Sequence, residues 1–394
     1  MLLKRFAQNR NVSVLFAVIL LSSLSVNLST PIWAFYITSL GASVVELGYI
    51  SAIPSAVSAF VNILGGSLSD RYGRRKLNAL GTCLGTLPPL FYIFAKNWVE
   101  LIPWVILSGL AGGLGMPVRW SMIADSSSED RRAMMFGLMN IALLLGMTVA
   151  PILGGLIADA YGIRTTFVLY FVLMSASFFC SLLLQESMKP LSRHQTQKSD
   201  TAESRTFVGT MLIVLTLNVA VATGTGIYSP ITPLFLEKRF STVYADVGIL
   251  YAIGFGLSSM MVQIPGGKMA TKYNRKKLVI VTTVLSTPFF GLFALSRSFV
   301  ECVILMFLSN VILNLSWPAY QDLTMALTPP SRRGLMNGLS GTSFLAGMMI
   351  GQAISGILWE SFGMFLPYYL SAVLVLISAL PAFFLKETGS RAQP

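Results

Sequence analysis

The chain is a succession of long apolar stretches separated by short polar loops. About twelve stretches reach roughly 20 residues, the length that a helix needs to cross a bilayer. Backbone N–H and C=O groups cannot stay unpaired in lipid, so each stretch is predicted to be a helix. The predicted spans of the first half are 12–38, 46–68, 78–96, 101–125, 133–158 and 164–186. Those of the second half are 207–236, 247–269, 278–296, 300–326, 334–358 and 364–385.

The start of the chain resembles a signal peptide, because Lys4, Arg5 and Arg10 precede an apolar run. That run continues past Pro31 to Tyr36, which is longer than the apolar region of a signal peptide. We therefore expect an uncleaved first span.

One connection, from Ser187 to Arg205, is longer and more polar than the others. It divides the predicted spans into six and six. We expect an all-α membrane protein with twelve transmembrane helices in two pseudo-symmetric six-helix bundles. The predicted units are a first bundle at 1–186, a central cytoplasmic loop at 187–206 and a second bundle at 207–394.

The composition supports a membrane protein. Hydrophobic residues make up 54% of the chain and charged residues only 11%, against roughly 25% charged in a soluble domain. This excludes a disordered chain, a coiled coil and a disulfide-stapled secreted domain.

The net charge of +12 would suggest nucleic acid in a soluble chain. Here the basic residues lie in short loops, so they indicate orientation and no nucleic-acid partner is expected. The side that carries both termini holds 22 of the 28 Lys and Arg residues, and the other side holds five. Positive loops face the cytoplasm. We expect a multi-pass protein of the plasma (inner) membrane with both termini cytoplasmic.

Residues for catalysis or metal binding are scarce. Cys83, Cys180 and Cys302 lie in apolar segments and are expected to be reduced core residues. The single histidine, His194, lies in a polar loop. A zinc site, a histidine-based triad and a P-loop are all missing from the sequence. We expect no enzyme and no cofactor, with the proton as the candidate coupling ion.

The two halves repeat one another. Gly66–Lys76 (GSLSDRYGRRK) aligns with Gly267–Lys277 (GKMATKYNRKK) at an offset of 201, and Arg131–Gly137 aligns with Arg332–Gly338 at the same offset. Two six-span bundles in parallel repeat place a binding site at their interface and rock about it to give alternating access.

The loop after the second span is similar to the signature of the major facilitator superfamily of secondary transporters, in its drug/proton antiporter branch. Its matching residues are Gly66, Leu68, Asp70, Arg71, Gly73, Arg74 and Arg75. The resemblance implies a latch in which Asp70 faces the N-terminus of the eleventh helix, near Ser331, and Arg74 pairs with Asp125. The alternative is a loop that only sets orientation. The predicted latch residues are Gly66, Asp70, Arg71, Gly73, Arg74, Asp125, Arg131 and Arg132.

Small residues in the fifth and eleventh spans follow helical spacing, which allows close helix packing. The fifth span also resembles a motif of proton-driven exporters in this family, with Ala150 in place of one glycine; in the eleventh span Gln352 replaces the proline. The predicted packing residues are Gly146, Ala150, Pro151, Gly154, Gly155, Gly347 and Gly351.

Polar residues at helical spacing mark candidate cavity faces, and the family resemblance implies a cavity among the first, fourth, seventh and tenth helices. Such residues can equally make helix–helix hydrogen bonds. The candidates are Ser25, Ser29, Trp33, Tyr36, Arg119, Asn218, Thr225, Ser229, Asn310, Asn314, Trp317 and Gln321.

Two charged residues bear on coupling. The arginine that exporters of the family carry in the fourth span would fall at Val105, and Arg119 is the nearest substitute in charge. Arg119 could serve substrate or coupling, or it could snorkel or pair with Asp125. Asp322, near the inner end of the tenth span, is the candidate coupling carboxylate.

Three functions follow from these features. The first is proton-coupled efflux of amphipathic compounds. The second is uptake of a small polar or anionic nutrient by symport or facilitated diffusion. The third is a membrane receptor that does not transport. The expected partners are a small-molecule substrate, protons and the lipid bilayer, and we expect a functional monomer.

Overall fold

A computed structural model describes residues 10–127, 129–186, 201–329 and 332–385. These residues form twelve helical spans, in agreement with the sequence. The spans of the first half are α2 (Arg10–Leu28) with α3 (Trp33–Ser39), α4 (Val44–Tyr72), α5 (Arg74–Tyr92), η1 (Trp98–Leu101) with α6 (Ile102–Asp125), α7 (Glu129–Tyr161) and α8 (Ile163–Leu182). Those of the second half are α9 (Thr201–Tyr228) with α10 (Thr232–Phe240), α11 (Tyr244–Tyr251) with η2 (Ala252–Leu257) and α12 (Ser258–Lys272), α13 (Arg275–Leu295), α14 (Phe299–Asn314) with α15 (Trp317–Ala326), α16 (Arg333–Phe362) and α17 (Leu366–Phe383).

Judged by length and composition alone, eleven of the described spans are long and apolar enough to cross a membrane. The twelfth, α5, begins with Arg74, Arg75 and Lys76 and carries Asn78, which lower its average hydropathy. Within the first bundle α5 packs against α6 and α8. The neighbouring helices therefore place α5 across the membrane although its composition is less apolar.

Several spans are interrupted where the apolar pattern predicts continuous helices. The first span breaks between Leu28 and Trp33, and the seventh between Tyr228 and Thr232. Each break contains a proline, Pro31 and Pro230, which cannot donate a backbone hydrogen bond. The two breaks occupy equivalent places in the repeat, and each leaves a short helix, α3 or α10, at one end of the molecule.

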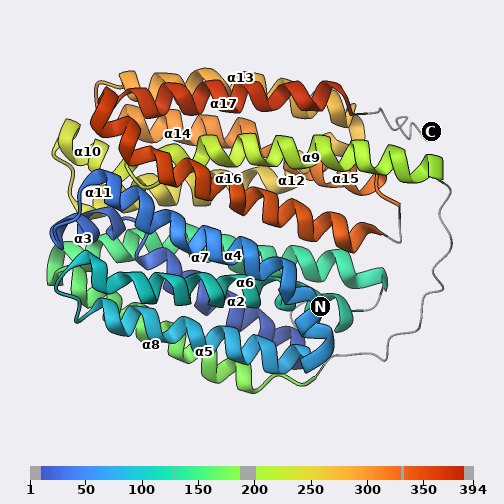
Figure 1. Cartoon of the computed structure of the whole chain (residues 1–394), viewed down its shortest axis with the longest axis horizontal. Coiled ribbons are helices and arrows are strands. Elements are labelled where there is room, and N and C mark those ends of the chain that lie inside the picture. Colours follow the sequence, from blue (N-terminus) through green and yellow to red (C-terminus); the bar gives the residue numbers. More distant parts are fainter. Residues whose placement is uncertain (1–9, 128, 187–200, 330–331, 386–394) are drawn as a thin grey trace.

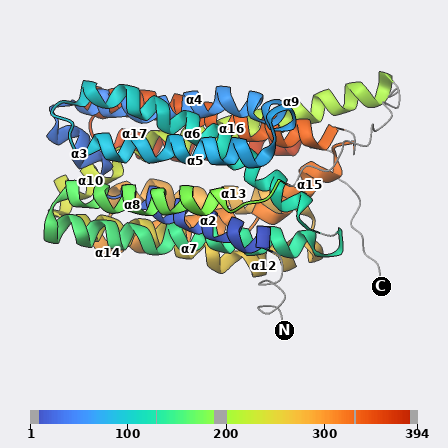
Figure 2. The same cartoon turned by 90° about the horizontal axis from the view of Figure 1, so that it is seen from below.

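Helices of the first half and helices of the second half form two bundles, which are stacked vertically in Figure 1. In the first bundle α2 packs against α7 and α8; in the second, α9 packs against α16 and α17. The bundles meet through two pairs of crossing helices, α4 with α16 and α7 with α11 and η2. Figure 2 shows α4 and α16 in one row of helices and α7 and α12 in the other, so the two contacts lie on opposite sides of the interface.

The buried apolar residues show how the bundles are arranged along the membrane. One large core cluster combines residues of both halves, including Tyr36, Phe167, Phe235 and Tyr368, and lies toward the end that carries α3 and α10. Away from that end each half has its own cluster of buried residues. One surrounds Met122 in the first half, and the other surrounds Tyr320 in the second half. The two bundles thus share a core at one end, which we call the closed end, and have separate cores toward the other.

Candidate functional site

The crossing helices touch through backbone at glycines near the closed end. A Cβ added at Gly48 of α4 would lie 2.7 Å from the carbonyl oxygen of Gln352 on α16, and one at Gly155 of α7 would lie 2.7 Å from Cα of Ala245 on α11. At the opposite end of α16, a Cβ at Gly334 would meet nothing within 4 Å. Close approach of backbone between the bundles therefore runs from the closed end to mid-helix, where a Cβ at Gly256 of η2 would lie 2.6 Å from Cα of Thr148 on α7.

The small residues of α7 serve two neighbours. A Cβ at Gly146 would lie 2.8 Å from the backbone nitrogen of Leu24 on α2, and Gly154 packs against Leu28 of the same helix. Pro151, by contrast, faces Gly248 of the second bundle. Ala150 is fully buried within this packing.

The small residues of α16 pack against α9 in the same way. A Cβ at Gly347 would lie 2.6 Å from the carbonyl oxygen of Val219, and Gly351 packs against Thr223. Helices α7 and α16 thus each pack on their own bundle with one face and on the partner bundle with another.

The loop between α4 and α5 is held at its second half. Gly73 has φ of 93° and forms the N-cap of α5. Its lack of a side chain leaves room for Glu186, whose carboxylate accepts hydrogen bonds from the backbone nitrogens of Arg74 (3.1 Å) and Arg75 (3.2 Å). The Arg74 guanidinium forms an ion pair with Asp125, the pair that the family resemblance implies.

The remaining predicted latch residues are only partly described. Arg71 stacks over the ring of Tyr72, and Arg132 is exposed. The side chains of Asp70 and Arg131, the surroundings of Gly66, and the residues Pro330 and Ser331 lie outside what the structure describes. Contact between this loop and the eleventh helix stays a prediction.

A matching ion pair ties the second bundle together and was missed by sequence reasoning. Arg275 Nη2 of α13 lies 2.7 Å from Asp322 Oδ2 of α15. Arg275 is the counterpart of Arg74 at the offset of 201, which was the available signal. The Asp322 side chain is 54% exposed, so it lies at the rim of the bundle and not deep within it.

Several candidate cavity residues of the first half make hydrogen bonds or ring contacts within their own bundle, and their role in a cavity stays a prediction. Ser25 is fully buried and donates to the carbonyl oxygen of Leu21 (2.6 Å). The Tyr36 hydroxyl donates to the carbonyl oxygen of Tyr92, and the Trp33 ring packs on both tyrosines. Tyr36 also belongs to the core that the two bundles share and lines a recess at their contact.

The same holds for two asparagines of the second half. Asn218 donates to the carbonyl oxygen of Ser340 (3.3 Å) and accepts from the hydroxyl of Tyr320 (2.7 Å). Asn310 donates to the carbonyl oxygen of Met306 one turn earlier (3.0 Å). Both are more than nine-tenths buried.

The remaining polar candidates are more accessible. Ser29, Thr225, Ser229 and Asn314 are half-buried, and Trp317 and Gln321 are exposed. Ser29 lies in the break of the first span and Ser229 in that of the seventh. These neutral hydroxyl, amide and indole groups form the candidate substrate-facing set that the structure leaves available.

Arg119 is buried between two helices of the first bundle. Its Nε donates to Oδ1 of Asn78 on α5 (3.1 Å), and only 7% of the residue is exposed. Of the alternatives given for Arg119, pairing with Asp125 is not the one observed, since the Arg119 guanidinium bonds to Asn78 and the ion pair described for that carboxylate is with Arg74. Arg119 is thus directed toward α5 and helps to join α5 to α6.

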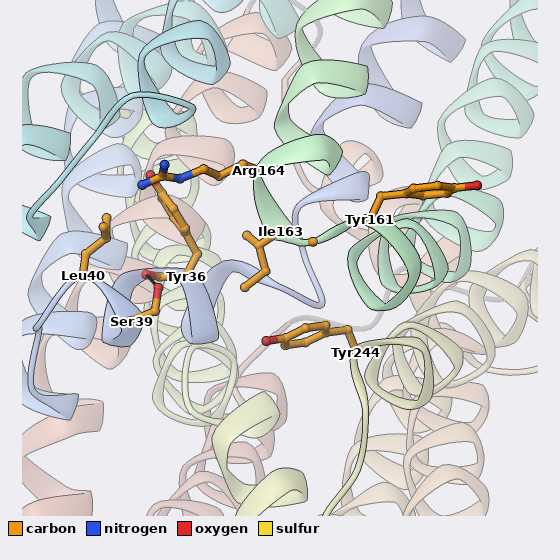
Figure 3. Close-up of a pocket in the computed structure, with 8 residues that line it drawn as sticks. Tyr36, Ser39, Leu40, Tyr161, Ile163, Arg164 and Tyr244 are labelled. Atoms are coloured by element: carbon orange, nitrogen blue, oxygen red, sulfur yellow. Dashed lines mark hydrogen bonds between the residues drawn. The ribbon is translucent and has the colours of Figure 1, made fainter.

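Two recesses flank the bundle contact at the closed end. One has a volume of about 480 Å³ and is shown in Figure 3, where Arg164 extends toward Tyr36 on one wall and Tyr244 lies below Ile163. Its lining residues are Tyr36, Ser39, Leu40, Tyr161, Gly162, Ile163, Arg164 and Tyr244. The other, of about 580 Å³, is formed by α10, the start of α4 and the end of α16. The repeat relates these elements, so the recesses come as a pair.

Within the described ranges, no group of three or more His, Cys, Asp or Glu side chains converges as metal ligands do. The three cysteines are free thiols.

Two helical bundles that share a core at one end and have separate cores toward the other are the architecture expected of a secondary transporter. The sequence profile of the Major Facilitator Superfamily matches residues 15–216 and 214–394. The chain therefore belongs to that superfamily, as the loop signature indicated, and it is a transporter and not an enzyme.

Relatives and solved structures cover nearly the whole chain. An uncharacterised MFS-type transporter of Methanocaldococcus jannaschii is 26% identical, covering 95% of this chain and 97% of the relative. The quinolone resistance protein NorA of Staphylococcus aureus is 23% identical, covering 89% of this chain and 90% of NorA. A bacterial homologue of the human lysosomal transporter Spinster, solved inward-facing and unoccupied, aligns with a TM-score of 0.80 at 14% identity, covering 95% of this chain and 96% of that one. A D-xylose–proton symporter aligns with a TM-score of 0.79 at 13% identity, covering 98% and 100%.

Proposed function

We propose that this protein exports small amphipathic molecules across the plasma membrane in exchange for protons, by alternating access. The observation that carries the proposal is the shared core at the closed end together with separate cores toward the other. A pair of bundles joined in this way can expose a central site to one side and rock to expose it to the other.

The direction of transport rests on the fifth span and on the relatives. Pro151, Gly154 and Gly155 of α7 follow the exporter motif and sit at contacts with both bundles. The similarity to the quinolone resistance protein NorA extends over 89% of this chain. Efflux accounts for both features.

The substrate class follows from the chemistry of the central helices. Carboxylates are absent from the sequences of α2 and of α9 between Thr206 and Tyr228, and the accessible cavity candidates there and on α14–α15 are neutral, while the carboxylate of Asp322 on α15 lies at the bundle rim. Binding of a cationic solute in the membrane would require a buried carboxylate to balance its charge. A neutral or amphipathic solute that packs on aromatic and methionine side chains fits better.

The coupling proposal centres on Asp322. Its carboxylate is paired with Arg275 and is half exposed at the bundle rim, so protonation would release the guanidinium and loosen α13 from α15. We place the closed end outside the cell and both termini in the cytoplasm, because the positive loops gather on the side of the termini.

The test uses purified protein in liposomes with an imposed pH gradient. A panel of lipophilic dyes and a fluoroquinolone is compared with D-xylose and a dipeptide, and internal pH is followed at the same time. We expect proton movement with the amphipathic compounds and none with the sugar or peptide. Gradient-driven movement of the sugar or peptide alone would contradict efflux of amphipathic compounds.

Asp322→Asn should abolish gradient-driven accumulation but keep downhill exchange of substrate. The matched control is Asp125→Asn, which breaks the equivalent ion pair of the first bundle. Equal loss of coupling in both variants would show that the pairs act on the fold and not on proton transfer.

A further inference from the structure

Helices α7 and α16 each carry, near their C-terminal end, a carboxylate that reaches the start of a helix in the opposite bundle. Asp159 of α7 accepts hydrogen bonds from the backbone nitrogens of Tyr244 (3.1 Å) and Ala245 (2.8 Å), at the N-terminus of α11. Glu360 of α16 accepts one from the backbone nitrogen of Val45 (3.2 Å), at the N-terminus of α4. Both contacts lie at the closed end.

The repeat relates the two contacts. Asp159 and Glu360 are separated by the offset of 201, and Ala245 and Val45 by 200. Four residues before each carboxylate, and so on the same helix face, a glycine (Gly155 or Gly356) packs against the same helix start. The glycine lets the partner helix approach, and the carboxylate one turn later caps it.

The first turn of a helix has backbone N–H groups without intrahelical partners and carries a partial positive charge, so it attracts carboxylates. Each of these two helix starts also has a cap from its own bundle. Glu46 accepts from the backbone nitrogen of Ser43 (2.7 Å), and Asp246 accepts from that of Val243 (3.1 Å). The first turn is thus shared between a carboxylate of its own bundle and one of the partner bundle.

We propose that Asp159 and Glu360 are a two-fold pair of gate residues that hold the closed end shut, each by capping a helix of the opposite bundle. The caps of the same bundle move with their helix and are preserved when the bundles rock, whereas the caps between bundles must break when the closed end opens. Asp159 and Glu360 therefore set how strongly the transporter favours the state with this end closed.

The proposal rests on alternating access, but its test measures a distance and needs no substrate. Spin labels are placed at Lys96 and Arg297, exposed and equivalent positions in the two bundles, in a chain whose three native cysteines are replaced. Pulsed dipolar spectroscopy in nanodiscs then gives the populations with this end closed and open.

Asp159→Asn should raise the open-to-closed ratio roughly fivefold, because that factor corresponds to the free energy of one carboxylate at the N-terminus of a helix. Glu360→Gln should raise it less, because Glu360 accepts one hydrogen bond and Asp159 two. The two residues share no partner, so the double variant should show the product of the single effects.

The matched controls are Glu46→Gln and Asp246→Asn, which remove caps from the same helix starts without touching the bundle contact. The proposal requires that these controls keep the wild-type distribution. An unchanged distribution in the double variant, or an equal shift in the controls, would overturn it. If the double variant does not fold, the distance distribution of the single Asp159→Asn variant is compared with that of Asp246→Asn. A shift in the first and none in the second supports the proposal, and equal distributions overturn it. A failure here leaves the efflux proposal untouched, since no transported compound enters the measurement.

Discussion

At the scale of single residues, the molecule depends on positions where any side chain would meet backbone. Gly154 of α7 is one of these. A Cβ there would lie 3.0 Å from Cα of Leu28 on α2 and closer still to its carbonyl oxygen. Backbone atoms of two long helices cannot move aside as a flexible side chain can. Gly291 of α13 is the opposite case, since a Cβ there would meet nothing within 4 Å.

Gly154→Ala should therefore lower the free energy of unfolding by about 1–3 kcal/mol, the usual cost of overpacking. Gly291→Ala should be neutral or stabilising, because alanine favours a helix by about 1 kcal/mol over glycine. Unfolding in mixed detergent micelles measures both. A Gly154→Ala protein as stable as the Gly291→Ala protein would contradict the close packing of α2 on α7.

At the scale of elements, an arginine at the start of one helix ties it to the end of the next. Arg74 at the start of α5 pairs with Asp125 and donates to the carbonyl oxygen of Ser121 (3.0 Å), both on α6. Arg275 at the start of α13 pairs with Asp322 on α15. The acid has moved within the repeat, yet the pairing of the two elements is kept.

Arg74→Ala should lower the free energy of unfolding by about 1–3 kcal/mol, because it removes a charged donor that bridges the carboxylate of Asp125 and the carbonyl oxygen of Ser121. Arg71→Ala is the control, since Arg71 is exposed and its described contact is the ring of Tyr72. Thermal inactivation of both variants in the same detergent provides the comparison. Equal midpoints would mean that the ion pair contributes nothing to joining α5 and α6.

At the scale of the whole molecule, an even number of spans places the start of α2 and the end of α17 toward the same end of the molecule, as Figure 1 shows. The excess of positive loops on that side predicts that it faces the cytoplasm. The repeat supplies matched positions for a test: Lys76 and Lys277 on the expected inner side, and Lys96 and Arg297 on the outer side.

Cysteines introduced at Lys96 and Arg297 should react with a membrane-impermeant maleimide in intact cells. Cysteines at Lys76 and Lys277 should react only after the cells are permeabilised. All four positions are exposed in the structure, so a lack of labelling reports the membrane and not burial. The reverse pattern would invert the orientation and place the closed end inside the cell.

Sequence reasoning was strongest for the class of protein and weaker for the site. Hydrophobic length identified twelve spans, including α5, whose basic first turn weakens its signal. Helical spacing also picked out polar stripes, but it does not say which neighbour a stripe faces. Ser25 and Asn218 turned out to bond within their own bundles, and Arg119 turned toward Asn78.

Length, apolar character and loop charge are local properties, so the chain alone was enough to establish a membrane-spanning, twice-repeated helical protein. Which side chains meet across the repeat depends on segments far apart in the chain, and no local pattern encodes that. Asp159 and Glu360 looked like ordinary polar residues at helix ends, and they became a matched pair only when folding brought the helix starts of the opposite bundle within hydrogen-bonding distance.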